Sequence, residues 1–232
     1  MAVAHDTDTK SHTTGGSQGE PSFSWSHTGA ASGVKGVLVL TWNFSSATNI
    51  VTGVTYGGSA LTAVTGGSAA DTLTEPGNVT SYFLGSSVPQ GTQTVVVSRT
   101  NNTNIMWAVA ISVLADGDTS YAGVLLEQEN QALTEENVND GSPGANSVRY
   151  LGLFSGTPDL VDIPAGANST ALQGIVLNGH PGQAYRETTA GQGARPIGAV
   201  AVSDDVAAVY LAVTELVAAA PTLRVLSSPQ RW

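Results

Sequence analysis

The segment Asn49–Val64 places two short runs of β-prone residues on either side of a Gly57-Gly58 pair. Val, Thr, Ile and Tyr dominate both runs, and these residues favour the pleated, half-buried surface of a β-strand. A Gly-Gly pair between two such runs indicates a two-residue hairpin turn, because glycine readily adopts the positive φ that these turns require. Short runs of this kind, separated by Gly, Ser, Asn and Pro, continue along most of the chain. The sequence therefore predicts an all-β protein.

The remaining β-prone runs are numerous enough for one antiparallel β-sandwich. Lys35–Phe44 carries a continuous apolar run, which predicts a central strand buried on both faces. Thr92–Ser98 and Ile105–Leu114 are expected to be antiparallel neighbours joined by the polar tip at 100–104. Further strands are expected at 2–9, 22–27, 60–64, 79–84, 121–126, 148–154, 171–177, 183–188 and 197–202, a spacing that is typical of a sandwich.

The last apolar segment, Val206–Val217, is rich in Ala and Leu and is therefore open to a helical interpretation. Its β-branched valines, and the turn residues Asp204-Asp205 in front of it, favour a strand. Two polar stretches are interpreted as loops. They are residues 65–78 and the acidic stretch 127–146, part of which could form one helical turn.

One sandwich domain with long loops is therefore expected at 1–217, followed by a C-terminal extended arm at 218–232. The arm contains Arg224 and ends in Arg231 and Trp232. Because Arg and Trp are favoured at the hot spots of protein interfaces, these three residues are candidates for binding a partner. The alternatives are an arm that folds back on its own domain and an arm that is disordered.

The composition excludes several classes of partner. Only 11% of the residues are charged, against roughly 25% in an average globular domain. The formal net charge is −10, and the few basic residues form no stripe, so neither nucleic acid nor an anionic membrane is expected as a partner. The chain has no cysteine, no long apolar span and no signal-peptide pattern. We therefore expect a protein without disulfides that is made in the cytoplasm.

The sequence lacks the common catalytic and metal-binding patterns. The four histidines do not have the spacing of a zinc-binding pair, and no Gly-x-Ser-x-Gly elbow joins a strand to a helix. Paired acidic residues are interpreted as solvated loop charges, with calcium binding or glycoside hydrolysis as less favoured alternatives. These pairs are Asp116/Asp118, Glu135/Glu136, Asp159/Asp162 and Asp204/Asp205. We therefore assign no catalytic, cofactor-binding or metal-binding residue, and we do not expect an enzyme.

Aromatic residues offer one candidate for a glycan contact. Most of the fourteen lie inside apolar runs, where packing in the core is the better interpretation. Tyr185 is the best candidate for an exposed ring, because it follows the turn-like sequence His180-Pro181-Gly182. A sugar-binding role at Tyr185 is therefore kept as an alternative.

Several segments together carry a likeness to a known family. They are Ser22–His27, Lys35–Leu40, Val54–Thr62, Ser81–Leu84, Pro89–Val97, Ala108–Val113 and Ser203–Ala212. In this order they resemble a jelly-roll-like β-sandwich of tailed-phage structural proteins, which also occurs as a repeated unit in bacterial surface proteins. The Val-Thr-Tyr-Gly-Gly element at 54–58 is the most specific of these segments, whereas the acidic stretch 127–146 and the arm after 217 depart from the family pattern.

The resemblance implies a single antiparallel β-sandwich of jelly-roll type with no catalytic residue. It also implies a virion protein made in the host cytoplasm, and first of all a capsid decoration protein that binds the assembled capsid surface and stabilises it. The implied partners are the major capsid protein or other virion proteins, together with further copies of the chain in a trimer or dimer. The alternative is a tail or fibre module that binds a cell-surface glycan.

Overall fold

The regular elements that the structure, a computed structural model, shows in its described residues are β-strands. It describes residues 3–12, 20–44, 46–72, 76–100, 104–129, 136–138, 146–156, 163–166, 168–177, 180–188, 197–199 and 206–216. These ranges contain sixteen strands, every strand pair is antiparallel, and no helix in them could span a membrane. The prediction of an antiparallel all-β protein is therefore confirmed.

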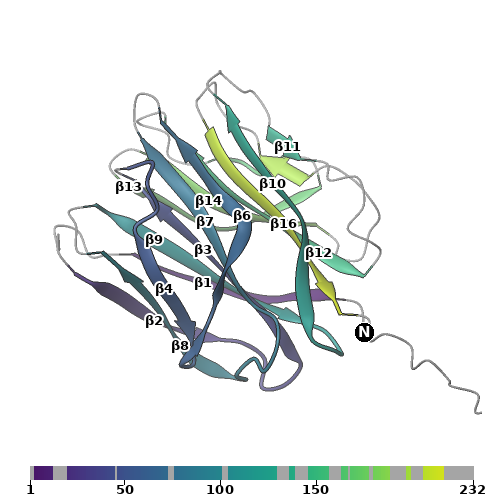
Figure 1. Cartoon of the computed structure of the whole chain (residues 1–232). Coiled ribbons are helices and arrows are strands. Elements are labelled where there is room, and N and C mark those ends of the chain that lie inside the picture. Colours follow the sequence, from purple (N-terminus) through teal and green to yellow (C-terminus); the bar gives the residue numbers. More distant parts are fainter. Residues whose placement is uncertain are drawn as a thin grey trace, which may run out of the picture.

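Three sheets form the body of the protein, and Figure 1 shows the central sheet between the other two. The central sheet has the order β1 (Ala4–His12), β9 (Met106–Leu114), β3 (Val34–Asn43), β7 (Gly77–Leu84) and β6 (Thr62–Asp71). The four-stranded sheet has the order β2 (Ser22–Thr28), β8 (Thr92–Arg99), β4 (Val51–Tyr56) and β5 (Ser59–Ala60). The C-terminal sheet has the order β10 (Thr119–Glu129), β16 (Val206–Glu215), β12 (Ser147–Ser155), β14 (His180–Glu187) and β13 (Ser169–Leu177). A small separate sheet pairs β11 (Glu136–Val138) with β15 (Ile197–Ala199).

In the middle of the central sheet, β3 and β9 are buried on both faces because apolar residues occupy successive positions along them. On β3, Leu38 and Leu40 pack against the C-terminal sheet, whereas Val37 and Val39 pack against the four-stranded sheet. The prediction that Lys35–Phe44 contains a central strand buried on both faces is confirmed. The molecule is thus three sheets deep, one more than the two-sheet sandwich that the strand spacing suggested.

The first nine strands pair in a nested order. β1 pairs with β9, β2 with β8, β3 with β7, and β4 with β5. These strands therefore form one long antiparallel ribbon that is closed at the β4–β5 hairpin. The ribbon is rolled, so that successive pairs lie alternately in the central sheet and in the four-stranded sheet. β6 is added at the edge of the central sheet, next to β7.

The expected pairing of Thr92–Ser98 with Ile105–Leu114 is wrong. β8 pairs with β2 and β4 in the four-stranded sheet, whereas β9 pairs with β1 and β3 in the central sheet. The burial of the two strands explains this separation. β8 alternates between exposed and buried residues, which suits an outer layer, whereas β9 is buried along nearly its whole length, which suits the middle layer.

The turn at Gly57 and Gly58 is confirmed. Their φ angles are +55° and +83°, as expected of a two-residue hairpin turn with a positive φ at both central positions. The run that follows is divided, because β5 ends at Ala60 and β6 then begins at Thr62 in the central sheet. The chain therefore passes from one sheet to the next within two residues of this hairpin.

Two expected loops contain strands. β6 runs through 62–71, so half of the predicted 65–78 loop belongs to a strand. A register shift between Ala63 and Ser68 contains the two glycines of this segment, and Gly66 has a φ of +73°. β10 continues to Glu129, into the acidic stretch, and β11 lies within it. The described part of 127–146 contains no helical turn, and its remaining residues lie outside the described ranges.

The strand interpretation of Val206–Val217 is confirmed, because β16 spans Val206–Glu215 between β10 and β12. The expected first strand is also confirmed, since β1 lies at an edge of the central sheet. Residues 217–232 lie outside the described ranges, so the arm and the domain boundary before it stay predictions.

Candidate interaction sites

Tyr185 lies inside the protein. It belongs to β14, opposite Leu151 of β12, and its side chain is fully buried. Its hydroxyl donates a hydrogen bond of 2.7 Å to the backbone carbonyl of Ile163. The expectation of an exposed ring is therefore wrong, because β14 has a strand on each side and a cluster of apolar side chains covers this face. A glycan cannot reach the ring in this arrangement, so Tyr185 is no longer a candidate for a glycan contact.

The other sequence-based candidates, Arg224, Arg231 and Trp232, lie outside the described residues. Their assignment as partner-binding residues stays a prediction. Among the acidic pairs, Asp116 and Asp118 lie in the connection from β9 to β10, and the backbone carbonyl of Asp118 accepts a hydrogen bond from the backbone of Leu216. Within the described ranges, no group of three or more His, Asp or Glu residues could hold a metal ion.

A buried ion pair lies on the outer side of the C-terminal sheet. The Nε of Arg149 on β12 is 2.7 Å from the Oε2 of Glu187 on β14, and both side chains are fully buried. Burial alone would lower the pKa of Arg149, but the hydrogen bond and the charge of Glu187 outweigh it and raise that pKa. The pair therefore stays charged inside the protein and links two neighbouring strands, which is a structural role.

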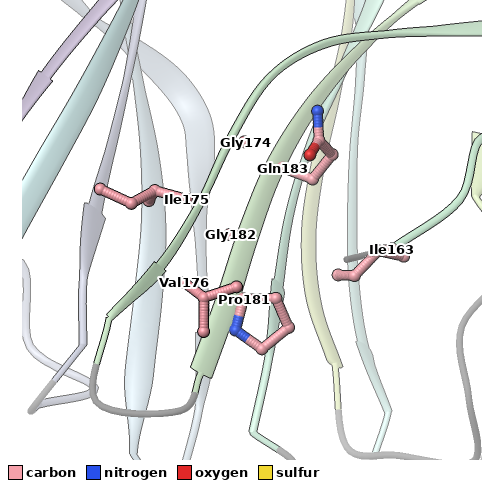
Figure 2. Close-up of a pocket in the computed structure, with 7 residues that line it drawn as sticks. All are labelled: Ile163, Gly174, Ile175, Val176, Pro181, Gly182 and Gln183. Atoms are coloured by element: carbon pink, nitrogen blue, oxygen red, sulfur yellow. The ribbon is translucent and has the colours of Figure 1, made fainter. Parts of the chain in front are cut away.

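A small cavity opens at the edge of the C-terminal sheet, beside the β13–β14 hairpin (Figure 2). Its volume is about 290 Å³, and it is lined by Ile163, Gly174, Ile175, Val176, Pro181, Gly182 and Gln183. Gln183 is the only polar side chain among them, and none is charged. The cavity therefore suits a small uncharged group, and it offers no nucleophile and no general base.

Gly174 shapes this cavity. It follows a register shift on β13, and a Cβ atom at this position would lie 1.8 Å from the Oε1 of Gln183. Only glycine lets the two strands approach this closely without displacing the amide. The cavity thus depends on the register between β13 and β14, which the sequence pattern alone does not give.

An open groove lies where the chain leaves the C-terminal sheet. Its volume is about 550 Å³, and it is lined by Thr62, Phe83, Gly85, Ser86, Thr119, Ser120, Tyr121 and Leu216. Phe83 and Tyr121 meet edge to face with their ring centroids 5.7 Å apart, and Leu216 is 53% exposed. The groove offers apolar contact area together with hydroxyl groups, and none of these lining residues is charged.

Strand β1 connects all three sheets through side-chain hydrogen bonds. Thr9 accepts a hydrogen bond from the Nε1 of Trp25 at 2.9 Å and bonds the Nδ1 of His27 at 2.8 Å, both on the four-stranded sheet. Towards the C-terminal sheet, Gln173 donates a bond of 2.6 Å to Asp8. Because His27 is fully buried, desolvation lowers its pKa and keeps the imidazole neutral.

The acidic groups of β1 serve the same structural purpose. Asp6 accepts hydrogen bonds from the backbone of Ala30 at 2.9 Å and from the hydroxyl of Ser112 at 2.8 Å. His5 lies 3.2 Å from Asp8. These residues carry titratable groups close together, but each is engaged in holding the sheets rather than facing an open cavity.

No protein-family model, no curated protein and no solved structure matches this chain. What the protein does must therefore be argued from its topology and its surfaces.

Proposed function

We propose that this chain is a non-enzymatic structural protein of a tailed-phage particle, and specifically a capsid decoration protein that binds the assembled capsid surface and stabilises it. The observation that carries the proposal is the nested pairing of the first nine strands. Four antiparallel pairs, β1/β9, β2/β8, β3/β7 and β4/β5, alternate between two facing sheets. We infer a jelly roll from this order, an architecture that is common in viral capsid and lectin domains.

The C-terminal sheet adds a third layer to this inferred jelly roll. It shares a continuous core with the central sheet, in which Leu40, Trp107 and Leu211 take part. A body with two cores resists deformation, which suits a protein whose work is to hold neighbouring subunits together. The resemblance of the Val-Thr-Tyr-Gly-Gly element to tailed-phage structural proteins supports the same proposal.

On this proposal, binding to the assembled lattice alone stabilises the lattice by mass action. Because oligomers favour closed symmetry, a trimer or dimer placed on a capsid symmetry axis is the expected form. The proposed arm at 218–232 would reach a neighbouring subunit through Arg224, Arg231 and Trp232, since Arg and Trp are favoured at interface hot spots.

The test is to mix the purified full chain with undecorated capsids of the phage that encodes it. We expect saturable binding, measured by co-sedimentation, and an increase in the temperature at which the capsids release their DNA. The double variant Arg231→Ala/Trp232→Ala should bind more weakly, whereas the matched variant Ser227→Ala/Ser228→Ala should bind like the unmodified chain. Absence of binding by the unmodified chain, or binding without any gain in heat resistance, would overturn the proposal.

A further inference from the structure

The outer face of the four-stranded sheet is covered by hydroxyl groups. Along β2 and β8, apolar and aromatic side chains point inwards, and Ser or Thr occupies nearly every position in between. Six of these hydroxyl residues are exposed, and two more, Thr55 and Ser98, are half-buried. The exposed ones are Ser22, Ser24, Ser26, Thr28, Thr92 and Thr94. We call this surface the hydroxyl face.

The strand register arranges these hydroxyls in rows. Ser26 lies opposite Thr94, and Ser22 lies opposite Ser98. Neighbouring strands are about 4.8 Å apart, and successive residues on one face of a strand are about 7 Å apart. Within the described part of the chain, a single hydrogen bond joins two of the face hydroxyls, the 3.1 Å bond between Thr28 and Thr92. The other face hydroxyls are therefore available to a ligand.

The hydroxyl face carries no charge. The only charged residue in the four strands of this sheet is Arg99, which is 3% exposed and donates to the backbone carbonyl of Glu20 on the inner side. Elsewhere the chain is acidic: residues 115–232 hold 13 of the 18 acidic residues and five of the eight basic ones, a formal charge of −8. A nucleic acid, an anionic polymer or a strongly basic partner would find no opposite charge on this face.

The face is also a poor protein interface. Three strands of six to eight residues span roughly 15 Å by 25 Å, or about 400 Å², which is half of what each partner of a stable dimer buries. The cores of protein interfaces are rich in aromatic residues, Met and Arg and poor in Ser, whereas this face has no exposed aromatic ring among its described residues. A second copy of the chain is therefore not the occupant that the face fits.

We propose that the hydroxyl face binds a neutral polysaccharide. Each hydroxyl can donate one hydrogen bond and accept two, which matches the alternating donors and acceptors of a sugar. Serine and threonine have short side chains, so little side-chain entropy is lost when a ligand orders them. A glycan chain that crosses from β2 to β8 would meet facing hydroxyls at Ser22/Ser98, Ser26/Thr94 or Thr28/Thr92. The strands are about 4.8 Å apart, which is close to the repeat of a pyranose unit. This proposal does not depend on binding to a capsid.

Contact with a single face would be weak, because each hydrogen bond replaces one with water. Dense display of many copies converts weak contacts into firm attachment without any new interaction. The experiment should therefore present the full chain densely on beads. Coupling through amines leaves the face free, since both lysines, Lys10 and Lys35, lie outside the four-stranded sheet.

The coated beads are incubated with particles of cellulose, starch and mannan, and the fraction of particles captured is measured. Particles of anionic pectin and particles coated with albumin serve as controls for charge and for protein docking. The test variant is Ser24→Ala/Ser26→Ala/Thr94→Val, which removes three face hydroxyls and keeps the shape of the strands. The matched control is Thr62→Val/Thr65→Val on β6, where both side chains are exposed away from this sheet.

We expect capture of at least one neutral polysaccharide, with an association constant about tenfold lower for the triple variant, the loss expected from removing three hydroxyls. The control variant should behave like the unmodified chain, and all three proteins should have the same unfolding midpoint. Failure to capture any of the three neutral polysaccharides overturns the proposal, and so does equal capture by the triple variant. Capture of albumin-coated particles that is lost in the triple variant would assign the face to a protein instead.

Discussion

Trp42 and Trp107 lie directly opposite each other on β3 and β9 and stack with their ring centroids 4.2 Å apart and their planes 24° apart. Both rings face the C-terminal sheet, and the Nε1 of Trp42 donates a hydrogen bond of 2.9 Å to the backbone carbonyl of Leu153 on β12. The backbone of β14 passes close over the pair at Gly182. The stacked pair therefore determines how closely the third sheet can approach the central one.

Gly182→Ala should destabilise the protein by about 1–3 kcal/mol, the usual cost of overpacking a core. A Cβ atom at this position would lie 2.7 Å from the Nε1 of Trp107 and 3.0 Å from both Phe44 Cζ and Trp42 Cδ1. None of these rings can move away without disturbing its own packing. Urea denaturation followed by tryptophan fluorescence measures the change in the free energy of unfolding.

Gly53→Ala is the matched control for that variant. Gly53 also lies in a strand, β4, but a Cβ atom there would meet no other atom within 4 Å. Because alanine restricts the unfolded chain more than glycine does, this change should be neutral or stabilising by up to about 1 kcal/mol. If both variants lost the same stability, close approach to the tryptophan pair would not be the cause.

Arg149→Met and Glu187→Met should each destabilise the protein by about 3–5 kcal/mol. Each change leaves one buried group without its partner at the 2.7 Å contact between the two side chains. The double variant Arg149→Met/Glu187→Met should recover much of this loss, because two apolar side chains need no compensation for desolvation. A double-mutant cycle on the free energy of unfolding measures the coupling, and additive losses would contradict it.

The sequence predicted which residues form strands better than it predicted which strands pair. Lys35–Phe44 was identified as a strand buried on both faces because apolar residues occupy successive positions in it, as in Val37–Leu40. The pairing of β8 with β2 and β4, instead of β9, depends on contacts between residues that are 39 to 76 positions apart along the chain. The third sheet was missed for the same reason, since the local pattern of a strand does not say which layer it joins.

The candidate sites likewise depend on strand pairing, which the local sequence pattern does not give. Tyr185 follows Pro181 and Gly182, which indicated a surface turn, but a strand on each side of β14 buries the ring. Part of the hydroxyl face could have been predicted from the sequence, because Ser22, Ser24 and Ser26 alternate with aromatic residues that point inwards. Its extent across β8 and β4 depends on the register, which only the structure supplies.

The unfolding free energy should fall as the pH drops below about 6.5, and His27 should account for part of this fall. Burial lowers the pKa of His27 in the folded protein, against an unfolded value of 6.5, although the negative charges of Asp6 and Asp8 partly oppose it. The folded protein then binds fewer protons at this site than the unfolded chain does. The contribution of His27 is fully present above the unfolded pKa and is lost as the pH falls towards the folded pKa.

Urea denaturation at several pH values between 5 and 7 measures this dependence. His27→Gln should flatten the curve in that window, and a curve as steep as that of the unmodified chain would contradict the prediction. Asp8 also has a lowered pKa: burial alone would raise it, but its hydrogen bonds with His5 and Gln173 prevail. Because that pKa lies below 3.8, Asp8 affects stability only at lower pH and does not contribute to the change between pH 5 and 7.

Gly57→Ala should cost more stability than Gly58→Ala, although the two glycines share one turn. Both have a positive φ, so alanine at either position incurs a backbone strain of about 1–2 kcal/mol. At Gly57 a Cβ atom would also lie 2.5 Å from the Oε1 of Gln93 and 3.0 Å from two atoms of Pro89, whereas at Gly58 it would meet nothing within 4 Å. We therefore expect Gly57→Ala to be the more destabilising by about 1 kcal/mol, as measured by urea denaturation. Equal losses would mean that only the backbone conformation constrains this turn, and that Gln93 moves aside without cost.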